Sequence, residues 1–254
     1  MCRAQPRSIL TAFSRTDRVM VSPRHLAGTG LDRVGDTFGP LIHRFGWNAD
    51  HDAATGRVRV HSPDHSLKVA FDPTEFDGTW WTITHHEPYW TVEFTRQTPA
   101  EAVAAVTQCL PQMLGDQRHS DRIHLTRLSI ADIAALNHWT ASPGEGEFTS
   151  ADGYCTLRHT PDAETSYAVH NSIHDGFDTT WTANFTVDTP DPLVRQFFAH
   201  LSSPDPVERE FREIPYLARD LGDTLITPVR GASVSPHAHH HAAQAGRALA
   251  ARRR

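Results

Sequence analysis

Residues 90–99 read WTVEFTRQTP, and residues 181–190 read WTANFTVDTP. The two stretches align without a gap, and six of their ten positions are identical. Apolar and polar side chains alternate along the first part of each stretch, which indicates a strand with one buried face. The Thr-Pro pair that ends each stretch is typical of the first residues of a helix. The chain therefore contains the same strand-to-helix unit twice.

Matches on both sides extend this similarity. Trp47 and Ala49 correspond to Trp139 and Ala141, and the turn Ser-Pro-Asp-His at 62–65 corresponds to Ser-Ala-Asp-Gly at 150–153. Apolar positions after the shared strand also correspond: Val103 with Val194, Val106 with Phe197, and Leu110 with Leu201. These matches outline two copies of about 90 residues, which indicates a duplicated structural unit.

A helix is predicted after each shared strand. In the first copy, Thr98 is placed to cap the helix, Pro99 suits its first position, and Glu101 would complete a capping box. The second copy keeps Thr189 and Pro190 but has Pro192 in place of the glutamate. The predicted inward positions are mostly apolar: Ala102, Val106, Cys109, Leu110 and Met113, then Leu193, Val194, Phe197, Phe198 and Leu201.

Period-2 runs predict the remaining strands at 57–61, 66–71 and 79–84, with weaker counterparts at 154–159, 166–172 and 180–187. Turn residues such as Asp64 separate them. A helix is expected to open each copy, at 31–45 and 129–139, with Gly39 and Pro40 interrupting the first. The predicted fold class is α+β: two tandem repeats, each a roughly four-stranded antiparallel sheet with a C-terminal helix packed on one face.

The predicted organisation has five parts: a disordered leader at 1–19, repeat 1 at 20–115, repeat 2 at 121–205, a C-terminal docking segment at 206–230, and a disordered His/Ala/Arg tail at 231–254. Apolar residues in 206–230 indicate that this segment docks on a folded surface. The tail contains four of the eighteen histidines, three of them consecutive, in an alanine-rich context typical of disorder.

The charge of the chain is unevenly distributed. Residues 1–19 carry a net charge of +3 and residues 231–254 carry +4. Because the whole chain carries −6, residues 20–230, which we call the body, carry −13. An acidic body argues against broad binding to phosphate backbones, which relies on clustered Lys and Arg. Three widely spaced cysteines predict neither disulfides nor a Cys-x-x-Cys metal site and fit a reduced cytoplasm. No apolar run has the length of a signal peptide or a membrane span.

The motifs in their order resemble a known family. These motifs are Val-Ser-Pro-Arg-His-Leu-Ala-Gly at 21–28, Gly-Trp at 46–47, Ser-Pro-Asp at 62–64, and the Trp-x-x-x-Phe strand with its Thr-Pro helix start. Together they resemble domain of unknown function 317, which is found in streptomycetes and related actinobacteria and often occurs as two tandem copies. The resemblance covers roughly residues 20–205. It implies no activity, cofactor or catalytic residue.

The tryptophans shared by the two copies, at 47, 90, 139 and 181, are predicted to lie in the core because large aromatics dominate the burial of a small sheet. Period 2 instead places Trp80 outward, on the face that also carries Arg57, Arg59, His61 and Lys68. Cations beside an exposed Trp are typical of single-strand nucleic acid binders. An ordinary solvated face, or one packed against the second copy, explains the same pattern. Tyr154 and Arg158 are the weaker candidates in the second copy.

No catalytic or metal site is predicted. His85 and His86 are adjacent, so along a strand they point to opposite faces and cannot share a metal ion. Asp64 and His65 resemble an acid-base pair, but the second copy has Asp152 followed by Gly153, so a turn role covers both copies. Motifs for a nucleophilic serine or for phosphate binding are absent.

The sequence therefore favours a non-catalytic cytoplasmic binding module, without cofactor, whose two repeats form one surface for a protein partner. The alternative is single-stranded nucleic acid binding by the outward sheet faces. Tandem units of four strands and a helix also build Whirly-type DNA-binding domains, which is a topological analogy only. The oligomeric state and the identity of the partner leave no trace in the sequence.

Overall fold

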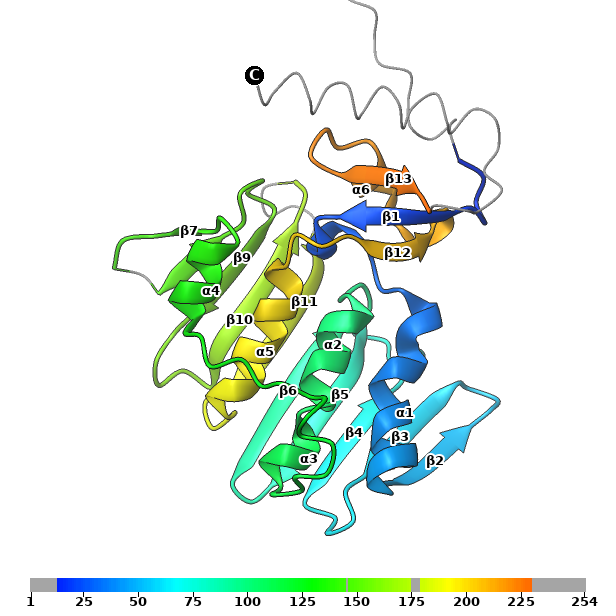
Figure 1. The fold of residues 1–254 in the computed structure, drawn as a ribbon, viewed down its shortest axis with the longest axis vertical. Helices are drawn as coiled ribbons and strands as arrows, with labels where there is room; N and C mark the ends of the chain where they lie inside the picture. The colour runs from blue at the N-terminus through cyan, green and yellow to red at the C-terminus, as the bar shows by residue number, and fades with distance from the viewer. Residues whose placement is uncertain (1–12, 145, 175–178, 230–254) are drawn as a thin grey trace, which may run out of the picture. The chain divides into compact units, whose positions relative to one another are not determined.

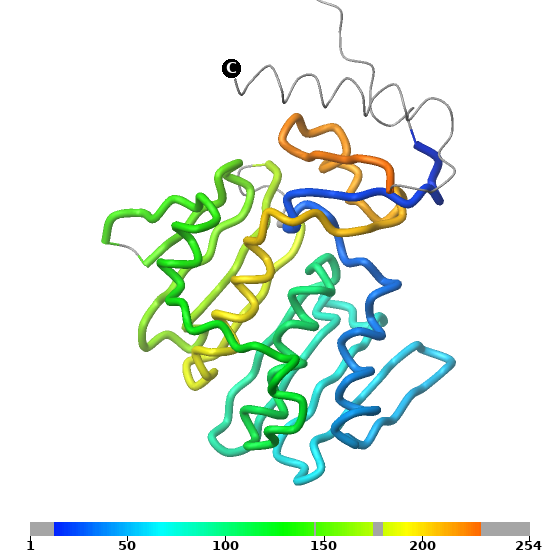
Figure 2. Tube along the Cα trace, viewed as in Figure 1, coloured from blue at the N-terminus to red at the C-terminus, as the bar shows by residue number. Residues whose placement is uncertain are grey.

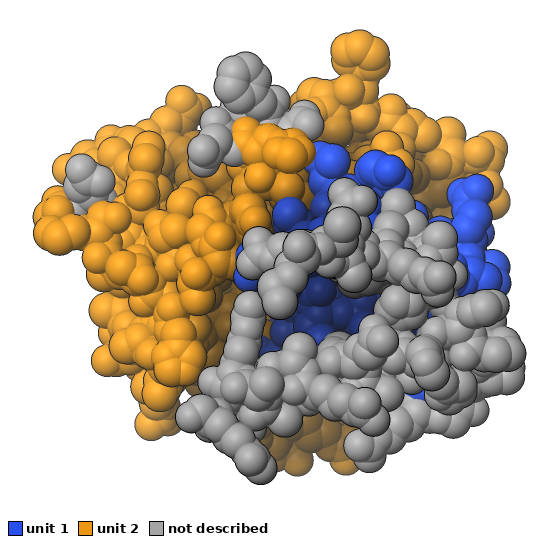
Figure 3. All heavy atoms as spheres, turned by 90° about the horizontal axis from the view of Figure 1, so that it is seen from above, with its two compact units in different colours: residues 1–30, 204–254 blue, residues 31–203 orange. Residues whose placement is uncertain are grey.

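The computed structural model describes residues 13–144, 146–174 and 179–229. The chain divides into two compact units (Figures 1 and 3): unit 1 contains residues 1–30 and 204–254, and unit 2 contains residues 31–203. The predicted tail and the first twelve residues of the predicted leader lie outside the described residues. Among the described residues, no helix is long and apolar enough to cross a membrane.

Unit 2 is built on one antiparallel sheet of ten strands. Its strands follow the order β2-β3-β4-β5-β6-β11-β10-β9-β8-β7, so the second half of the chain repeats the order of the first in reverse. The strands are β2 (Asn48–Asp52), β3 (Arg57–His61), β4 (Leu67–Phe71), β5 (Thr79–His86), β6 (Tyr89–Thr95), β7 (Thr140–Ala141), β8 (Glu147–Thr149), β9 (Cys155–His159), β10 (Thr165–Ser172) and β11 (Thr179–Thr186).

The helices of unit 2 lie on one face of this sheet, toward the viewer in Figure 1. They are α1 (Val34–Phe45), α2 (Ala100–Thr107), α3 (Leu110–Met113), α4 (Ile130–Leu136) and α5 (Asp191–Ser202), and the short 3-10 turn η3 (Leu31–Arg33) precedes α1. The antiparallel α+β class is therefore confirmed. The expected pair of four-stranded sheets is not observed, because five strands from each half join in a single sheet.

The two halves meet at β6 and β11, the strands that carry the shared Trp. These strands pair antiparallel, with Phe94 opposite Ala183 and Val92 opposite Phe185. Threonine hydroxyls add bonds across the joint: the backbone N–H of Thr182 donates to Oγ1 of Thr95 at 2.7 Å. The N–H of Thr91 donates to Oγ1 of Thr186 at 2.8 Å. The polar positions of the shared strand thus hold the halves together.

The predicted turns at 62–65 and 150–153 have the same hydrogen bonds. Oγ of Ser62 donates to Asp64 at 2.6 Å, and the N–H of Leu67 donates to Oγ of Ser62 at 2.9 Å. In the second half, Ser150 donates to Asp152 at 2.5 Å, and the N–H of Cys155 donates to Oγ of Ser150 at 3.0 Å. The turn interpretation of both aspartates is confirmed.

The expected break of the first helix at Gly39 and Pro40 is wrong. Helix α1 runs through Pro40 without interruption. A proline leaves the carbonyl four residues earlier without its helical partner. That carbonyl belongs to Asp36, and the side chain of Gln108 on the neighbouring segment donates to it at 3.1 Å. A tertiary contact therefore offsets the lost helical hydrogen bond.

The predicted capping box of Thr98 and Glu101 is also wrong. Helix α2 begins at Ala100 with Pro99 at its N-cap position, and no side chain caps it. Thr98 is buried, and its hydroxyl donates to the backbone carbonyl of Thr182 on β11 at 3.3 Å. Thr98 therefore forms a hydrogen bond across the joint between the halves and does not cap the helix.

The core of unit 2 lies between the sheet and the helices and contains the residues that periodicity predicted. The four shared tryptophans are all buried, as are the predicted inward positions of α5. Phe94, Phe185 and Phe197 pack against one another, with ring centroids 5.2 to 5.9 Å apart, so an aromatic cluster lies at the joint. Of the predicted inward positions of the first copy, only Met113 remains partly exposed.

Unit 1 is a small three-stranded sheet of order β12-β1-β13. Its strands are β1 (Arg18–Ser22), β12 (Val207–Glu210) and β13 (Leu225–Pro228), accompanied by the 3-10 turns η2 (Arg24–Leu26) and η4 (Phe211–Glu213) and by α6 (Tyr216–Arg219). Residues 20–30, assigned from sequence to repeat 1, share this unit with the segment predicted to dock. Residues 18 and 19 of the predicted leader lie in its central strand.

A fully buried arginine, Arg209, explains why residue 30 is a glycine. The Arg209 guanidinium donates to the carbonyl of Glu208 at 2.7 Å and to that of Gly28 at 3.4 Å. A Cβ added at Gly30 would lie 2.6 Å from Cζ of Arg209, and Gly30 has φ +70°. Glycine is therefore required at this position both for space and for backbone conformation.

We expect Gly30→Ala to destabilise unit 1 by at least about 1–2 kcal/mol, the cost of the left-handed conformation for a residue with a Cβ, with a further cost from the clash with Arg209. Hydrogen exchange of the β1 amides, such as those of Val19 and Val21, should become faster. Gly222→Ala is the matched control in the same unit, because a Cβ there meets nothing within 4 Å. Equal β1 exchange in the two variants would contradict this role for Gly30.

Candidate functional site

The sheet of unit 2 has a second face on which none of its described helices lies; we call it the open face. One row of outward residues crosses it from β2 to β8 through consecutive register partners. The row contains Asp50, Arg59, Ala70, Thr82, Glu93, Asn184, Ala168, Arg158 and Glu147. Candidate residues from both halves, Arg59 and Arg158, thus belong to one continuous surface.

Threonines occupy the centre of the open face. They lie at 82, 84, 91 and 95 on β5 and β6, and at 182 and 186 on β11, all partly exposed. Among the described outward residues of β5, β6, β11 and β10, Glu93 is the one carboxylate or Arg/Lys side chain. Most charged groups lie toward the outer strands of each half. The face therefore has a polar, charge-poor centre and a charged periphery.

Arg57 and Trp80 do not form the exposed cation and stacking pair that the sequence suggests. Arg57 forms an ion pair with Asp72. Trp80 packs edge to face on Phe71, with ring centroids 5.8 Å apart, and the guanidinium of Arg96 lies 5.2 Å from its ring centroid. A β-bulge next to Trp80 shifts the register here. Protein groups thus occupy much of the ring that a base would stack on.

Three other predicted residues do come together. Arg59, His61 and Lys68 lie on adjacent strands, and His61 is the register partner of Lys68. Together with His65 and His86 they form a group that we call the basic patch. Partial burial, followed by the positive charges of His65, Lys68, Arg59 and His86, holds the pKa of His61 below its usual range. The basic patch is therefore a place where an anion would relieve repulsion.

The second-half candidates are balanced by an acid. Arg158 is exposed and donates two hydrogen bonds to Glu147, at 2.9 and 2.7 Å. Tyr154 is partly exposed and directly precedes β9. The second half thus contributes a neutral ion pair to the open face where the first half contributes the basic patch.

The surroundings of Asp64, Cys109 and Cys155 suit structural roles. A hydrogen bond from Ser62 lowers the pKa of Asp64, so this carboxylate is stabilised as a turn acceptor. Burial raises the pKa of the Cys109 thiol to about 12 and that of Cys155 well above its usual value, which makes both thiols poor nucleophiles. Within 13–144, 146–174 and 179–229, no group of three His, Cys, Asp or Glu side chains is placed to hold a metal ion.

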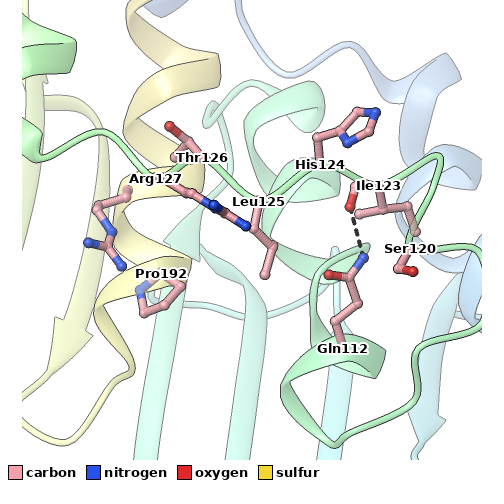
Figure 4. Close-up of a pocket in the computed structure, with 9 residues that line it drawn as sticks. Gln112, Ser120, Ile123, His124, Leu125, Thr126, Arg127 and Pro192 are labelled. Carbon is pink, nitrogen blue, oxygen red and sulfur yellow. Dashed lines mark hydrogen bonds between the residues drawn. The ribbon is translucent and has the colours of Figure 1, made fainter.

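Sequence reasoning missed a groove on the helical face. It is lined by the linker between the halves and by α3 and α5, and its volume is about 680 Å³ (Figure 4). The tube in Figure 2 shows the linker, in green, crossing from α3 to α4. The available signal was the linker composition, because residues 116–127 contain three arginines and two histidines.

Comparison with known proteins supports the resemblance. The family model SPDY, described as a domain of unknown function (DUF317), matches residues 61–112 and 149–207. Each matched segment spans the last three strands of its half and the helix that follows. No curated protein and no solved structure matches the chain.

The lowered pKa of His61 predicts a pH dependence of stability. Because the unfolded chain binds this proton more readily, stability should fall as the pH drops from about 6.5 toward the folded pKa. In His61→Gln the difference in unfolding free energy between pH 7 and pH 5 should be smaller than in the wild type, as measured by urea denaturation. His51→Gln, at an exposed position of β2, serves as the control. If His61→Gln reduced this pH-dependent difference in unfolding free energy no more than the control does, the role assigned to His61 would be refuted.

Proposed function

We propose that this chain is a non-catalytic cytoplasmic binding module without a cofactor and that its open face binds a protein partner. In this proposal the two halves are copies of one unit, and their fusion at β6 and β11 makes one surface from two. The proposal is consistent with the match of one family model to both halves. The arrangement of charges on the open face is the observation that carries it.

Protein interfaces have centres depleted of charged residues and rims that are polar and solvent-accessible. The open face follows this pattern. Threonine methyl and hydroxyl groups occupy three of its four central strands, β5, β6 and β11, while the charged pairs Arg57 with Asp72 and Arg158 with Glu147 lie outside them. Threonine offers both apolar contact and hydrogen bonds at a modest desolvation cost.

The size of the open face also matches that of a protein–protein interface. Ten strands about 4.8 Å apart span roughly 43 Å, and strands of this length extend roughly 20 Å, which corresponds to an area on the order of 800 Å². A standard interface buries about 800 Å² on each partner. Neither half provides that area by itself, so the fusion of the halves creates a surface of interface size.

A second candidate function is single-stranded nucleic acid binding, and the basic patch is the observation that favours it. Phosphate groups would neutralise Arg59, Lys68 and the histidines that surround them. Against it, Arg57 and Arg158 are already paired with carboxylates, and Arg96 and Phe71 pack on Trp80. The net charge of −13 on the body also opposes it. The protein partner is therefore the preferred proposal.

The central test is Thr82→Arg, which places a bulky charge in the middle of the open face. A protein that co-purifies in defined stoichiometry with the tagged full chain, from cells of the organism that encodes it, should be lost in this variant. Quantitative mass spectrometry measures the loss, and light scattering of the purified chain shows whether the partner is a second copy.

Ala135→Arg is the matched control, because Ala135 is an exposed position on α4. It adds the same charge and bulk on the helical side and should retain the partner. Identical sets of co-purifying proteins for the wild type and both variants would rule out the open face as the interface.

For the second candidate, we expect labelled single-stranded DNA to bind only weakly to the full chain at near-physiological salt, as measured by fluorescence anisotropy. If the basic patch binds DNA, Lys68→Gln should weaken binding several-fold, because each neutralised phosphate contributes to affinity and to salt dependence. The exposed Arg44 on α1 provides the control variant Arg44→Gln. Tight binding that Lys68→Gln abolishes and Arg44→Gln does not would replace the protein-partner proposal.

A further inference from the structure

Side-chain hydrogen bonds tie the linker of the groove on the helical face to the neighbouring helices. Two glutamines hold the linker to the helices: Nε2 of Gln112 donates to the carbonyl of Ile123 at 2.8 Å, and Nε2 of Gln196 donates to that of His124 at 3.3 Å. Oε1 of Gln196 accepts the N–H of Thr126 at 3.0 Å. Ile123 and Leu125 pack against the core of unit 2. Alternate linker residues are thereby fixed inward.

The cations of the groove come from separate segments. Arg127 belongs to the linker, and Arg195 lies one turn after Pro192 on α5. His124, Ser120 and Thr126 complete the polar lining. At one end of the groove in Figure 4, Arg127 of the linker lies with Pro192 of α5. No carboxylate is among the residues that line the groove.

The described residues do not neutralise the two arginines with an ion pair. Among the described residues, neither Arg127 nor Arg195 forms an ion pair. Nε of Arg195 is buried and has no hydrogen-bond partner in the part of the chain that the structure describes. A buried donor without a partner costs roughly 1–3 kcal/mol, more when it is charged. Arg195, which lines the groove, therefore has an unmet hydrogen-bond donor, and Arg127 adds a second positive charge to the same lining.

An acid on the same helix is Asp191, one helical turn before Arg195 on α5. Both act electrostatically on Tyr167: Asp191 raises the pKa of its hydroxyl and Arg195 lowers it, although burial is the larger cause of the raised pKa. Asp191 is exposed and does not line the groove. Asp191 therefore competes for Arg195 through its charge alone, because the described residues show no ion pair between them that a ligand would have to break.

We propose that this groove binds a small organic oxyanion, a phosphate monoester or a carboxylate, whose charged group lies between Arg195 and Arg127. Arginine pairs with both groups through two parallel hydrogen bonds. Ile123, Leu125 and Pro192 offer apolar contact to the body of the ligand, and a volume of about 680 Å³ lies within the range of small-molecule sites. This site is separate from the open face and independent of the proposed function.

The proposal predicts binding of phenyl phosphate to the full chain in isothermal titration calorimetry. Inorganic phosphate should bind more weakly because it lacks the apolar body. Benzoate tests the carboxylate form, and we expect it to bind more weakly than the dianionic phosphate ester because two arginines and His124 line the groove. Arg195→Gln and Arg127→Gln should each raise the Kd about tenfold or more. Asp191→Asn should lower it.

Arg122→Gln is the matched control, because Arg122 lies in the same linker, is exposed and does not line the groove. The Nε–H signal of Arg195 in NMR spectra of the wild type should shift on titration, which tests the site without any substitution. Absence of heat with millimolar phenyl phosphate and benzoate would overturn the proposal. Equal affinities of Arg195→Gln, Arg127→Gln and Arg122→Gln, with an unmoved Arg195 signal, would also overturn it.

Discussion

The antiparallel pairing of β6 with β11 is the constraint on which unit 2 depends. These are corresponding strands of the two halves, so pairing them edge to edge forces the remaining strands into mirrored order. It also places the helices of both halves on the same side of the sheet, since each follows its shared strand with the same hand. One core and one open face result. The threonine hydroxyls and the phenylalanine cluster at this joint are therefore the most consequential contacts in the unit.

Much of the fold was predictable because short-range signals determine it. Period 2 located seven of the ten strands of the large sheet, and the aligned tryptophans proved to be core residues. Strand β2 was not recognised because its sequence, Asn-Ala-Asp-His-Asp, is exposed along its whole length and has no apolar alternation. The pairing of β6 with β11 was not predicted, because the alternation of a strand does not reveal which strand it pairs with. The roles of Pro40 and Thr98 were predicted wrongly for the same reason. The contacts that decide them join residues that are distant in sequence: Gln108 donates to the carbonyl of Asp36, and Thr98 donates to that of Thr182.

The sequence predicted which candidate residues share a face of the sheet, but not which of them are paired with carboxylates. Alternation correctly aligned Arg59, His61 and Lys68 on one face. The carboxylates that neutralise Arg57 and Arg158 come from Asp72 and Glu147, which lie 15 and 11 residues away in sequence and were not recognised as partners. The groove arises from a linker that has no regular structure, so no periodic signal could mark it. Geometry was needed to show that its arginines face a common space.

The sheet of unit 1 imposes an unusual order on folding during synthesis. Its middle strand, β1, precedes the whole of unit 2 in the chain, yet both of its neighbours lie beyond residue 206. Domains ordinarily form from the N-terminus as they emerge. Here the whole of unit 2 is translated after β1 and before either of its partner strands, so β1 stays unpaired while unit 2 is made. A chain released before β13 is complete would leave β1 with one bare edge, which is the kind of surface that recruits chaperones or foreign strands.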